Sequence, residues 1–389
     1  MSACATAGPI VAAALCVITA AAAAQPSAAS DSGPAGNWSF GAVLDLGLSS
    51  RTVPLGLRDR GLALGHSDLG ASGPLGRHLA ARATVAVHQH DRRVEADVEE
   101  ASIETRTLPA GWSLRAGRFA SQVGYLNEQH PHADDFVQRP LLYRAFFGSH
   151  WNDDGLRLNW VAPTETLLRL GVERFQGRRL VGQPAPGHAG GVWTAALRAG
   201  GDLGREHAWQ LGLSYLHNRR EALVEDDEGA HHGAHEHHHA HAHAHGAAFS
   251  GRHLRLLDLT WKWAPDGNNS REQLRVSYER AQIRRLNRHA RRQDRHTADY
   301  LSVVWRFAPS WELGWRSDAL AVRIPHGDHF HAGRLREQSL MLAWKPSHRQ
   351  SLRLQVTRPT HARGFETSSG PALQLQYVLS FGAHPAHGF

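Results

Sequence analysis

The chain has 389 residues, with 43 Lys and Arg against 36 Asp and Glu, which gives a formal net charge of +7 at pH 7. The basic residues are spread along the chain without a recognised nucleic-acid-binding motif, so the composition does not favour a nucleic-acid partner. It also contains no Gly-x-Ser-x-Gly, His-Glu-x-x-His or phosphate-binding loop motif, and we therefore predict that the protein is not an enzyme.

The first 24 residues predict a secretory signal peptide. An apolar stretch from Pro9 to Ala24 is too short to span a bilayer and ends in small residues, as a cleavage site does. Cys4 and Cys16 are the only cysteines, and both lie in this removable segment. The mature chain therefore carries no thiol for a disulfide or a metal. Residues 25–36 are expected to form a periplasmic linker, and residues 37–389 the folded domain.

Beyond the linker, apolar residues recur at every second position in segments of strand length. This alternation is clearest near the C-terminus, at Leu373, Leu375, Tyr377, Leu379 and Phe381. About sixteen segments show it, which predicts strands at 41–48, 61–71, 80–90, 94–107, 112–118, 155–162, 165–176, 192–203, 209–218, 255–263, 273–283, 299–307, 311–322, 339–344, 351–358 and 373–381. The alternation fits a membrane barrel with a polar lumen, and it also fits a soluble sandwich with an apolar core.

The connections between segments distinguish these two alternatives. Four segments end on an aromatic residue shortly before a proline, at Trp160, Trp263, Phe307 and Trp344. Proline ends a β-ladder because it lacks an N–H, and an aromatic at that point matches the interfacial girdle of a membrane barrel. These short turns alternate with long polar loops. We therefore predict an all-β fold, a transmembrane antiparallel β-barrel of about 16 strands with short periplasmic turns, long His-rich extracellular loops and no plug domain.

One connection, at residues 119–154, is too long and too aromatic for a plain surface loop. Its apolar residues would allow it to fold inward and constrict the lumen: Phe136, Leu141, Leu142, Tyr143, Phe146, Phe147 and Trp151. An external lid over the mouth of the barrel is the equal alternative.

Histidine is unusually frequent, with 29 residues. The densest group lies in the loop at 217–253 and comprises His231, His232, His235, His237, His238, His239, His241, His243 and His245. Imidazole suits Zn²⁺, Ni²⁺, Co²⁺ and Cu²⁺, and an extended His-Ala-His stretch places its rings on one face. We favour a metal-collecting role. The alternative is a solvated low-complexity loop that binds metal only incidentally.

Two shorter groups mix histidine with carboxylates, the ligand set of a labile zinc site. One comprises His130, His132, Asp134 and Asp135, and the other comprises His326, Asp328, His329 and His331. Strand parity places both groups and the densest run on the extracellular side, which predicts a metal-collecting funnel at that rim. No resident cofactor is required, because the metal is the transported or loop-bound ion.

The predicted inward faces of the strands also carry arginines, namely Arg115, Arg157, Arg169, Arg275, Arg306 and Arg353. An arginine-lined lumen attracts anions, so a general or anion-preferring solute porin is the alternative function. A barrel that sequesters metal at the cell surface without transport is a further alternative, because it would need the same histidine loops.

Several stretches resemble a family of uncharacterised, plugless, porin-like outer-membrane β-barrels that is associated with zinc supply and sometimes labelled as TonB-dependent receptors. They are GYLNEQHPHADDF at 124–136, YRAFFG at 143–148, NDDG at 152–155 and the terminal GAHPAHGF at 382–389. The resemblance covers most of the mature chain. It implies a channel in the outer membrane of a Gram-negative bacterium that collects divalent metal ions, with zinc expected, and passes them into the periplasm.

The resemblance also implies partners for the barrel. Terminal Phe389 is similar to the signal that docks on the barrel assembly machinery by β-pairing. Outer-membrane lipid and lipopolysaccharide would surround the wall, and the fold is compatible with a homo-oligomer.

Overall fold

The computed structural model describes residues 38–90, 93–223, 246–326, 328–367 and 370–382. The predicted signal peptide (1–24), the linker (25–36), the histidines between 231 and 245 and the terminal Phe389 lie outside these residues.

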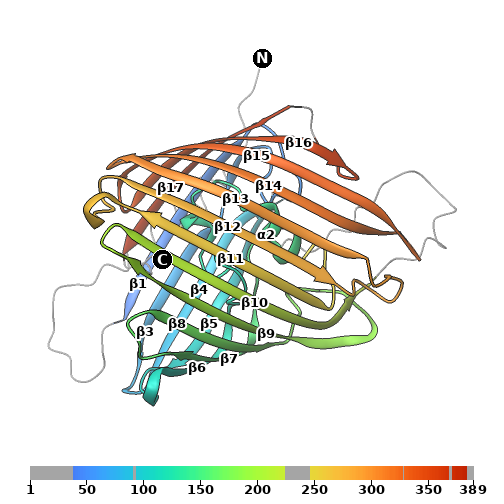
Figure 1. Ribbon diagram of the computed structural model, residues 1–389, viewed down its shortest axis with the longest axis horizontal. Coiled ribbons are helices and arrows are strands. Elements are labelled where there is room, and N and C mark those ends of the chain that lie inside the picture. The colour runs from blue at the N-terminus through green and yellow to red at the C-terminus, as the bar shows by residue number, and fades with distance from the viewer. Residues whose placement is uncertain (1–37, 91–92, 224–245, 327, 368–369, 383–389) are drawn as a thin grey trace.

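Antiparallel strands form one sheet that closes on itself into a barrel (Figure 1). The strands are β1 (Ser39–Ser49), β2 (Gly61–Leu64), β3 (Ser67–Leu75), β4 (Leu79–His90), β5 (Arg93–Thr105), β6 (Trp112–Ala120), β7 (Asn152–Val161), β8 (Leu167–Phe175), β9 (Pro184–Leu203), β10 (His207–Ala222), β11 (His253–Trp263), β12 (Gln273–Arg284), β13 (Arg295–Ala308), β14 (Trp311–His326), β15 (His329–Ser347), β16 (Gln350–Arg363) and β17 (Ala372–Gly382). The seam is the pairing of β1 with β17, where Leu44 faces Leu379. Because β2 and β3 both pair with β1 as one interrupted strand, the barrel has sixteen strands among the described residues, as predicted.

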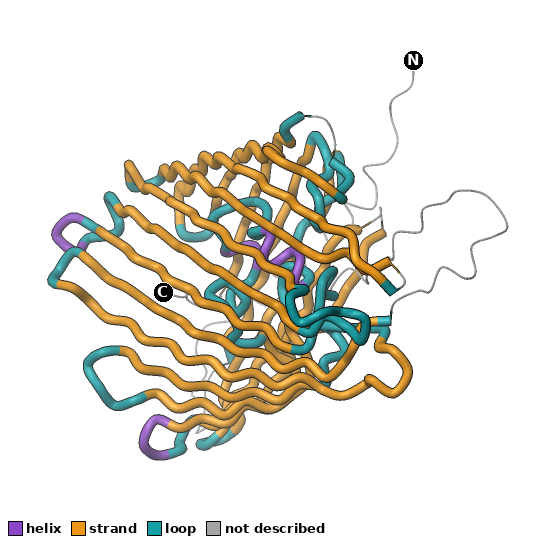
Figure 2. The backbone as a smooth tube through the Cα atoms, turned by 45° about the vertical axis from the view of Figure 1, so that its right-hand side comes forward, coloured by secondary structure: helices purple, strands orange, loops and turns teal. Residues whose placement is uncertain are grey.

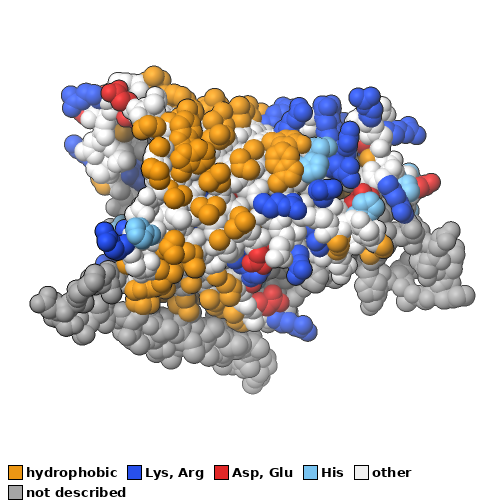
Figure 3. Space-filling model, turned by 90° about the horizontal axis from the view of Figure 1, so that it is seen from below, with side chains coloured by type: hydrophobic (Ala, Val, Ile, Leu, Met, Phe, Trp, Pro, Cys, Tyr) orange, Lys and Arg blue, Asp and Glu red, His pale blue; other side chains and the backbone are white. Residues whose placement is uncertain are grey.

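The two faces of the wall have the polarity of a membrane barrel. On β7, Leu156 and Leu158 point outward and are 54% and 44% exposed, whereas Arg157 and Asn159 point inward and are 3% and 8% exposed. A soluble sandwich would bury the leucines and expose the arginine. Apolar side chains gather over the wall on the half that carries the short turns, as one face of the molecule shows (Figure 3). The sandwich alternative is therefore excluded.

Aromatic residues mark the edge of this apolar surface at the short turns. Phe307 and Trp344 point outward and are 42% and 43% exposed, and Trp344 lies beside Trp311 of the neighbouring strand. Short 3-10 turns, η1 (Pro109–Gly111) and η4 (Pro265–Gly267), connect strands at this same end. The predicted aromatic-proline pattern thus lies at one rim of the barrel, where an interfacial girdle is expected.

Two connections that were predicted as loops are instead continued strands. β9 begins at Pro184, inside the connection between the predicted strands 165–176 and 192–203. β14 and β15 continue through the connection between the predicted strands 311–322 and 339–344, so that His326 faces His329 across the tip of a long hairpin. Both faces of these extensions carry polar residues, because they lie beyond the apolar surface. The period-two signal that identifies a half-buried strand is therefore missing there.

Residues 121–151, which we call the luminal loop, connect β6 to β7 inside the barrel (Figure 2). The loop contains η2 (Pro131–Ala133) and the helix α2 (Leu141–Phe147), and all seven residues of α2 are buried. The inward arrangement is thus the one observed, and the external lid is not. Among the described residues, none of the helices has the length and apolar character needed to cross a membrane.

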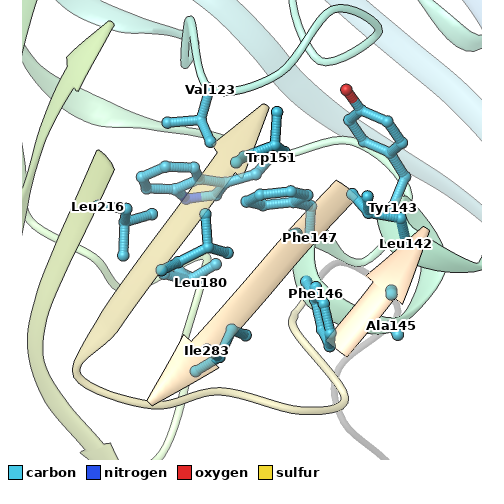
Figure 4. Packing of buried hydrophobic residues seen from close by; sticks show 14 of the residues in the cluster. Val123, Leu142, Tyr143, Ala145, Phe146, Phe147, Trp151, Leu180, Leu216 and Ile283 are labelled. Atoms are coloured by element: carbon cyan, nitrogen blue, oxygen red, sulfur yellow. The ribbon is translucent and has the colours of Figure 1, made fainter. Parts of the chain in front are cut away.

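The luminal loop is held by an aromatic core between itself and the wall (Figure 4). Phe147 stacks on Trp151 with ring centroids 6.4 Å apart, and Trp151 packs against Phe175 of β8 at 5.0 Å. Leu216 of β10 and Ile283 of β12 border the same core. Burying one large apolar side chain contributes about 1.5–3 kcal/mol, so this packing stabilises the inward position.

Candidate metal centre inside the barrel

The luminal loop has a defined shape because α2 ends sharply. Gly148 follows the helix with φ 57° and ψ 38°, a left-handed conformation that costs glycine little. The Ser149 N–H then donates a hydrogen bond to the Tyr143 carbonyl at 3.0 Å, which satisfies one carbonyl of the last turn. The chain therefore reverses and brings His150 back towards the wall.

Polar anchors fix the loop to the far side of the barrel. The Arg144 guanidinium pairs with Glu337 of β15, and both side chains are 0% exposed. The Tyr143 hydroxyl donates to the Glu279 carboxylate of β12 at 2.8 Å. An ion pair of this kind stabilises only when both partners are present, since the loss of one leaves a buried charge. These contacts fix the loop in one position relative to the wall.

On the near side, the loop and the wall together form a cluster of histidines and carboxylates. The wall supplies His66 from the interruption between β2 and β3, Asp68 from β3 and Glu99 from β5. His66 Nε2 lies 3.2 Å from Asp68 Oδ1 and 2.9 Å from Glu99 Oε2. Asp68 is 5% exposed and Glu99 4% exposed. We call these residues, together with those that the loop adds, the luminal cluster.

Two irregularities in the strands place the wall residues. The register of β4 with β5 shifts between Thr84 and Val85, which leaves Glu99 as an extra residue that bulges from the ladder. A bulge re-aims a side chain, and consequently Glu99 and the following Glu100 are both buried. The break between β2 and β3 similarly adds one residue opposite β1, before Asp68.

The luminal loop supplies three histidines to the cluster. His130 Nδ1 lies 3.0 Å from Asp68 Oδ2 and 3.6 Å from Glu99 Oε2. His132 Nδ1 lies 3.1 Å from Asp68 Oδ2, and His150 Nδ1 lies 3.5 Å from Glu99 Oε1. Pro131, between the first two, opens the 3-10 turn η2 that presents both rings to the wall.

The geometry of the cluster fits a metal ion. His66, Asp68, Glu99 and His130 each offer one ligand atom, and these atoms all lie within 4.8 Å of one another. Zinc held at about 2.0–2.2 Å spaces its ligand atoms by about 3.3–3.6 Å, and the measured His–carboxylate separations are 2.9 to 3.6 Å. Neither Asp68 oxygen forms a hydrogen bond of good geometry with any described residue, so these lone pairs converge on a shared space.

Burial and the nearby carboxylates together determine the pKa values of the loop histidines. Burial lowers the pKa of His130, but the carboxylates of Asp68 and Glu99 outweigh it and raise that pKa to about 10. Burial lowers the pKa of His150 to about 4. At neutral pH, the metal-free cluster therefore holds an imidazolium at His130 and a neutral ring at His150. A divalent cation would take over the charge-balancing role of the proton on His130.

The other predicted ligands of this loop do not join the cluster. Asp134 Oδ2 accepts a hydrogen bond at 2.7 Å from Arg139 Nε within the loop, and Asp135 pairs with Arg275 of β12. Both carboxylates neutralise arginines. The prediction that His130 and His132 lie at the extracellular rim is also wrong, because both lie inside the lumen on the luminal loop.

The second predicted group lies at the tip of the β14–β15 hairpin, and we call it the tip cluster. The ligand atoms of His326, His329 and His331 lie within 4.8 Å of one another. His329 Nδ1 lies 3.1 Å from Asp328 Oδ1, but these two side chains are 56% and 85% exposed. The structure thus brings the tip residues together in solvent. The densest predicted group, from His231 to His245, lies outside the described residues.

The predicted inward arginines do point into the lumen, where most are paired with carboxylates. The pairs are Arg115 with Glu104, Arg157 with Glu173, Arg169 with Glu128, Arg275 with Asp135 and Arg306 with Glu312. Arg353 instead donates to Gln376 Oε1 at 2.8 Å. The carboxylates offset much of the positive charge that the arginines alone would give the lumen.

Sequence reasoning missed four members of the cluster, His66, Asp68, Glu99 and His150. His66 and Asp68 are two residues apart on one strand face, which is a weak signal for a shared site. Glu99 and Glu100 are adjacent acids within a strand, and this breaks the alternation expected there. This break in the alternation is the feature of the sequence from which the bulge could have been predicted.

Comparison with known proteins places the fold. No protein-family model matches the chain. An uncharacterised protein of Aquifex aeolicus (strain VF5) is 25% identical over 363 residues, which cover 85% of this chain and 70% of that protein.

Among solved structures, the barrel is similar to OmpT of Vibrio cholerae with loop L8 deleted, with a TM-score of 0.58 and 13% identity over 89% of this chain and 100% of that one. It is also similar to OprB of Pseudomonas putida, with a TM-score of 0.55 and 10% identity over 90% and 94%. An anion-selective porin from Comamonas acidovorans gives a TM-score of 0.53 and 10% identity over 90% and 100%. These likenesses show the fold of an outer-membrane porin-type barrel.

Proposed function

We propose that this barrel lies in the outer membrane of a Gram-negative bacterium and binds a divalent metal ion, most favourably zinc, in its lumen on the way to the periplasm. The observation that supports this proposal is the convergence of His66, Asp68, Glu99 and His130 on one point, where the two carboxylates are buried and the two imidazoles are partly buried. The ion is cargo in this proposal and not a resident cofactor.

The ligand types favour zinc over the harder cations. Ca²⁺ and Mg²⁺ prefer sites made entirely of oxygen, whereas this cluster combines imidazole nitrogen with carboxylate oxygen. Nickel, cobalt and copper accept the same donors and bind more weakly or more strongly according to geometry. The described strands and loop supply no thiolate to the cluster, and the ordered pair of carboxylates matches the charge of a divalent ion.

A small cavity lies beside the cluster, where the luminal loop meets the wall. The cavity beside the cluster, lined among others by His66, Glu99 and His150, has a volume of about 70 Å³. This volume accommodates a metal ion with a few waters but no solute of appreciable size. Because the loop supplies His130, His132 and His150, a displacement of the loop would dismantle the ligand set and release the ion. Passage would therefore alternate between a bound state with the loop docked and a released state with the loop displaced.

The test is zinc binding to purified barrel in detergent, measured by calorimetry on wild type and on the Asp68→Asn/Glu99→Gln variant. We expect the variant to lose at least about 100-fold in affinity, since loss of even an outer-shell partner typically costs 10–100-fold. Glu104→Gln is the matched control. It removes a wall carboxylate that pairs with Arg115 outside the cluster, and it should bind zinc as wild type does.

Zinc flux into liposomes then separates transport from binding. Flux in wild type that is lost in the double variant but kept in Glu104→Gln supports the proposal. Equal zinc affinity in wild type and the double variant would show that the luminal cluster is not the zinc-binding site. Zinc binding without flux would leave a barrel that sequesters metal at the cell surface.

A general or anion-preferring porin is the second candidate. The likeness to an anion-selective porin and the inward arginines favour it. Planar-bilayer conductance that prefers anions and does not respond to zinc would make it the better account.

A further inference from the structure

Beyond the apolar surface, the outer face of the barrel carries a continuous band of exposed arginines. They come from six of the seven strands between β10 and β16 and comprise Arg219 of β10, Arg255 of β11, Arg280 and Arg284 of β12, Arg295 of β13, Arg334 and Arg336 of β15 and Arg358 and Arg363 of β16. In the remaining strand, β14, Arg323 is paired with Asp294. We call the nine exposed residues the arginine band. Figure 3 views the molecule from below, and on that face too basic side chains lie beside the apolar surface on the long-loop half; β15 and β16 lie at the top of Figure 1, away from this view.

The boundary between the apolar surface and the band runs at one height across the strands. On β15, the outward residues pass from Leu342 and Leu340 through Gln338 to Arg336 and Arg334. The register aligns this change with β16, because Leu340 faces Val356 and Gln338 faces Arg358. The same change occurs on β11, from Leu257 to Arg255. An aligned boundary of this kind marks the level at which acyl chains give way to polar headgroups.

Like charges face one another directly within the band. Arg284 lies opposite Arg295 across β12 and β13, and Arg334 lies opposite Arg363 across β15 and β16. Facing cross-strand residues have Cβ atoms about 4.5–5.5 Å apart, and like charges at this spacing repel. Such pairs are favourable only where an anion lies between them.

The part of the chain that the structure describes supplies few such anions. Within the described residues, Arg334, Arg336 and Arg358 form no ion pair with a carboxylate, in contrast to the paired arginines of the lumen. The acidic side chain that faces the band is Asp299, opposite Arg280. The band therefore has a large positive excess at the height of the lipid headgroups.

We propose that the arginine band binds the phosphate groups of a phosphorylated saccharolipid in the outer leaflet, while the acyl chains of that lipid cover the apolar surface below. Guanidinium groups bind phosphate oxygens with two parallel hydrogen bonds, and arginine is more weakly hydrated than lysine at an interface. This inference rests on the proposed outer-membrane location and is independent of the metal site.

The experiment titrates delipidated barrel with a bisphosphorylated glucosamine-disaccharide lipid and counts bound lipid by native mass spectrometry. The test variant is Arg334→Gln/Arg336→Gln/Arg358→Gln. The control Arg205→Gln/Arg271→Gln/Arg349→Gln removes three exposed arginines at the short-turn end. Because each basic residue near an anionic surface is worth about fivefold in affinity, we expect the test variant to bind about 100-fold more weakly and the control to bind as wild type.

Two further arms identify the ligand. The dephosphorylated lipid should bind wild type as weakly as the bisphosphorylated lipid binds the test variant. Inorganic phosphate should not displace the lipid at comparable concentration. Equal weakening in both variants, equal binding of the dephosphorylated lipid, or displacement by inorganic phosphate would each overturn the proposal. If the test variant does not fold, Arg219→Gln/Arg255→Gln/Arg280→Gln, on the neighbouring strands, gives the same test, and zinc binding should be unchanged in it.

Discussion

Histidines and aspartates gather at two places in this barrel, the luminal cluster and the tip cluster, under opposite conditions. In the luminal cluster, the side chains of Asp68 and Glu99 are 7% and 5% exposed, and two carboxylates lie among the imidazole rings. In the tip cluster, the side chains of Asp328 and His329 are 85% and 56% exposed, and a single carboxylate lies beside the rings. Both sets of histidine ligand atoms fall within the same 4.8 Å limit.

Proximity of the ligand atoms therefore does not by itself determine the affinity of a cluster for a metal ion. At the tip, metal binding must order exposed side chains, and the loss of their rotamer entropy weakens binding. Water also competes for each ligand atom there. In the lumen, the fold has already ordered the ligands against packed neighbours, and low polarizability around them strengthens each contact with a cation. The luminal cluster is therefore expected to bind tightly, and the tip cluster weakly.

The largest effect is expected from breaking the anchor that holds the luminal cluster together. Arg144→Met leaves the Glu337 carboxylate buried without its partner, and losing one member of such a pair costs about 3–5 kcal/mol. We expect the luminal loop to detach while the wall stays folded, so that single-channel conductance rises and zinc affinity falls. Conductance in planar bilayers and calorimetry measure the two effects.

A second change isolates the effect of the unpaired charge. Arg144→Met combined with Glu337→Leu removes both charges and should recover most of the loop docking. If the double variant conducts as strongly as Arg144→Met, the unpaired Glu337 carboxylate is not what displaces the loop, and other contacts of Arg144 hold it.

A smaller effect is expected from pH in metal-free protein. The pKa of His130 is raised to about 10 by the carboxylates that outweigh its burial, whereas an unfolded histidine titrates at about 6.5. A raised pKa means that the protonated ring stabilises the docked loop fully below about pH 6.5, and that this stabilisation is lost as the pH rises through about 10. His130→Gln should therefore lower the thermal midpoint most at pH 6 and hardly at all above pH 10. Thermal unfolding followed by tryptophan fluorescence, with a chelator present, measures the difference, and a midpoint gap that grows with pH would contradict it.

The smallest effect is expected at the tip. The His326→Ala/His329→Ala/His331→Ala variant changes exposed residues that pack against little, so stability should change by no more than about 0.5 kcal/mol. Calorimetry should show that one weak zinc equivalent is lost while the tight luminal binding is kept. A fall in luminal affinity would show that the two clusters are coupled, and the contrast between them would no longer hold.

The wall of the barrel could be predicted from the sequence because each strand repeats one simple constraint. Lipid on one side and a polar lumen on the other impose a period of two, and this period is readable in segments such as Leu156 to Trp160. The constraint ends where the strands leave the apolar surface, and for that reason the sequence did not reveal that β14 and β15 continue to His326 and His329.

The luminal cluster could be predicted only in part. The pattern around Pro131 selected His130 and His132, which lie beside Asp68 in the structure, but it also selected Asp134, whose carboxylate pairs with Arg139. The partners that matter come from distant strands, and the His66–Glu99 contact spans 33 residues of sequence. Glu99 reaches it through a bulge, which is a feature of backbone register and leaves little trace in residue pattern.

The position of the luminal loop in the chain has a consequence for how the barrel is assembled. The loop follows β6, yet its anchors lie on strands made much later: the Arg144–Glu337 pair spans 193 residues and the Val137–Gln355 hydrogen bond spans 218. Contacts of such separation form slowly, because the intervening chain must first be arranged. Until β15 and β16 arrive, Phe146 and Phe147 have only part of their final surroundings and are exposed to association with other chains. The apolar side chains of the luminal loop therefore complete their packing only when the last strands are in place, and the seam between β1 and β17 closes around the loop.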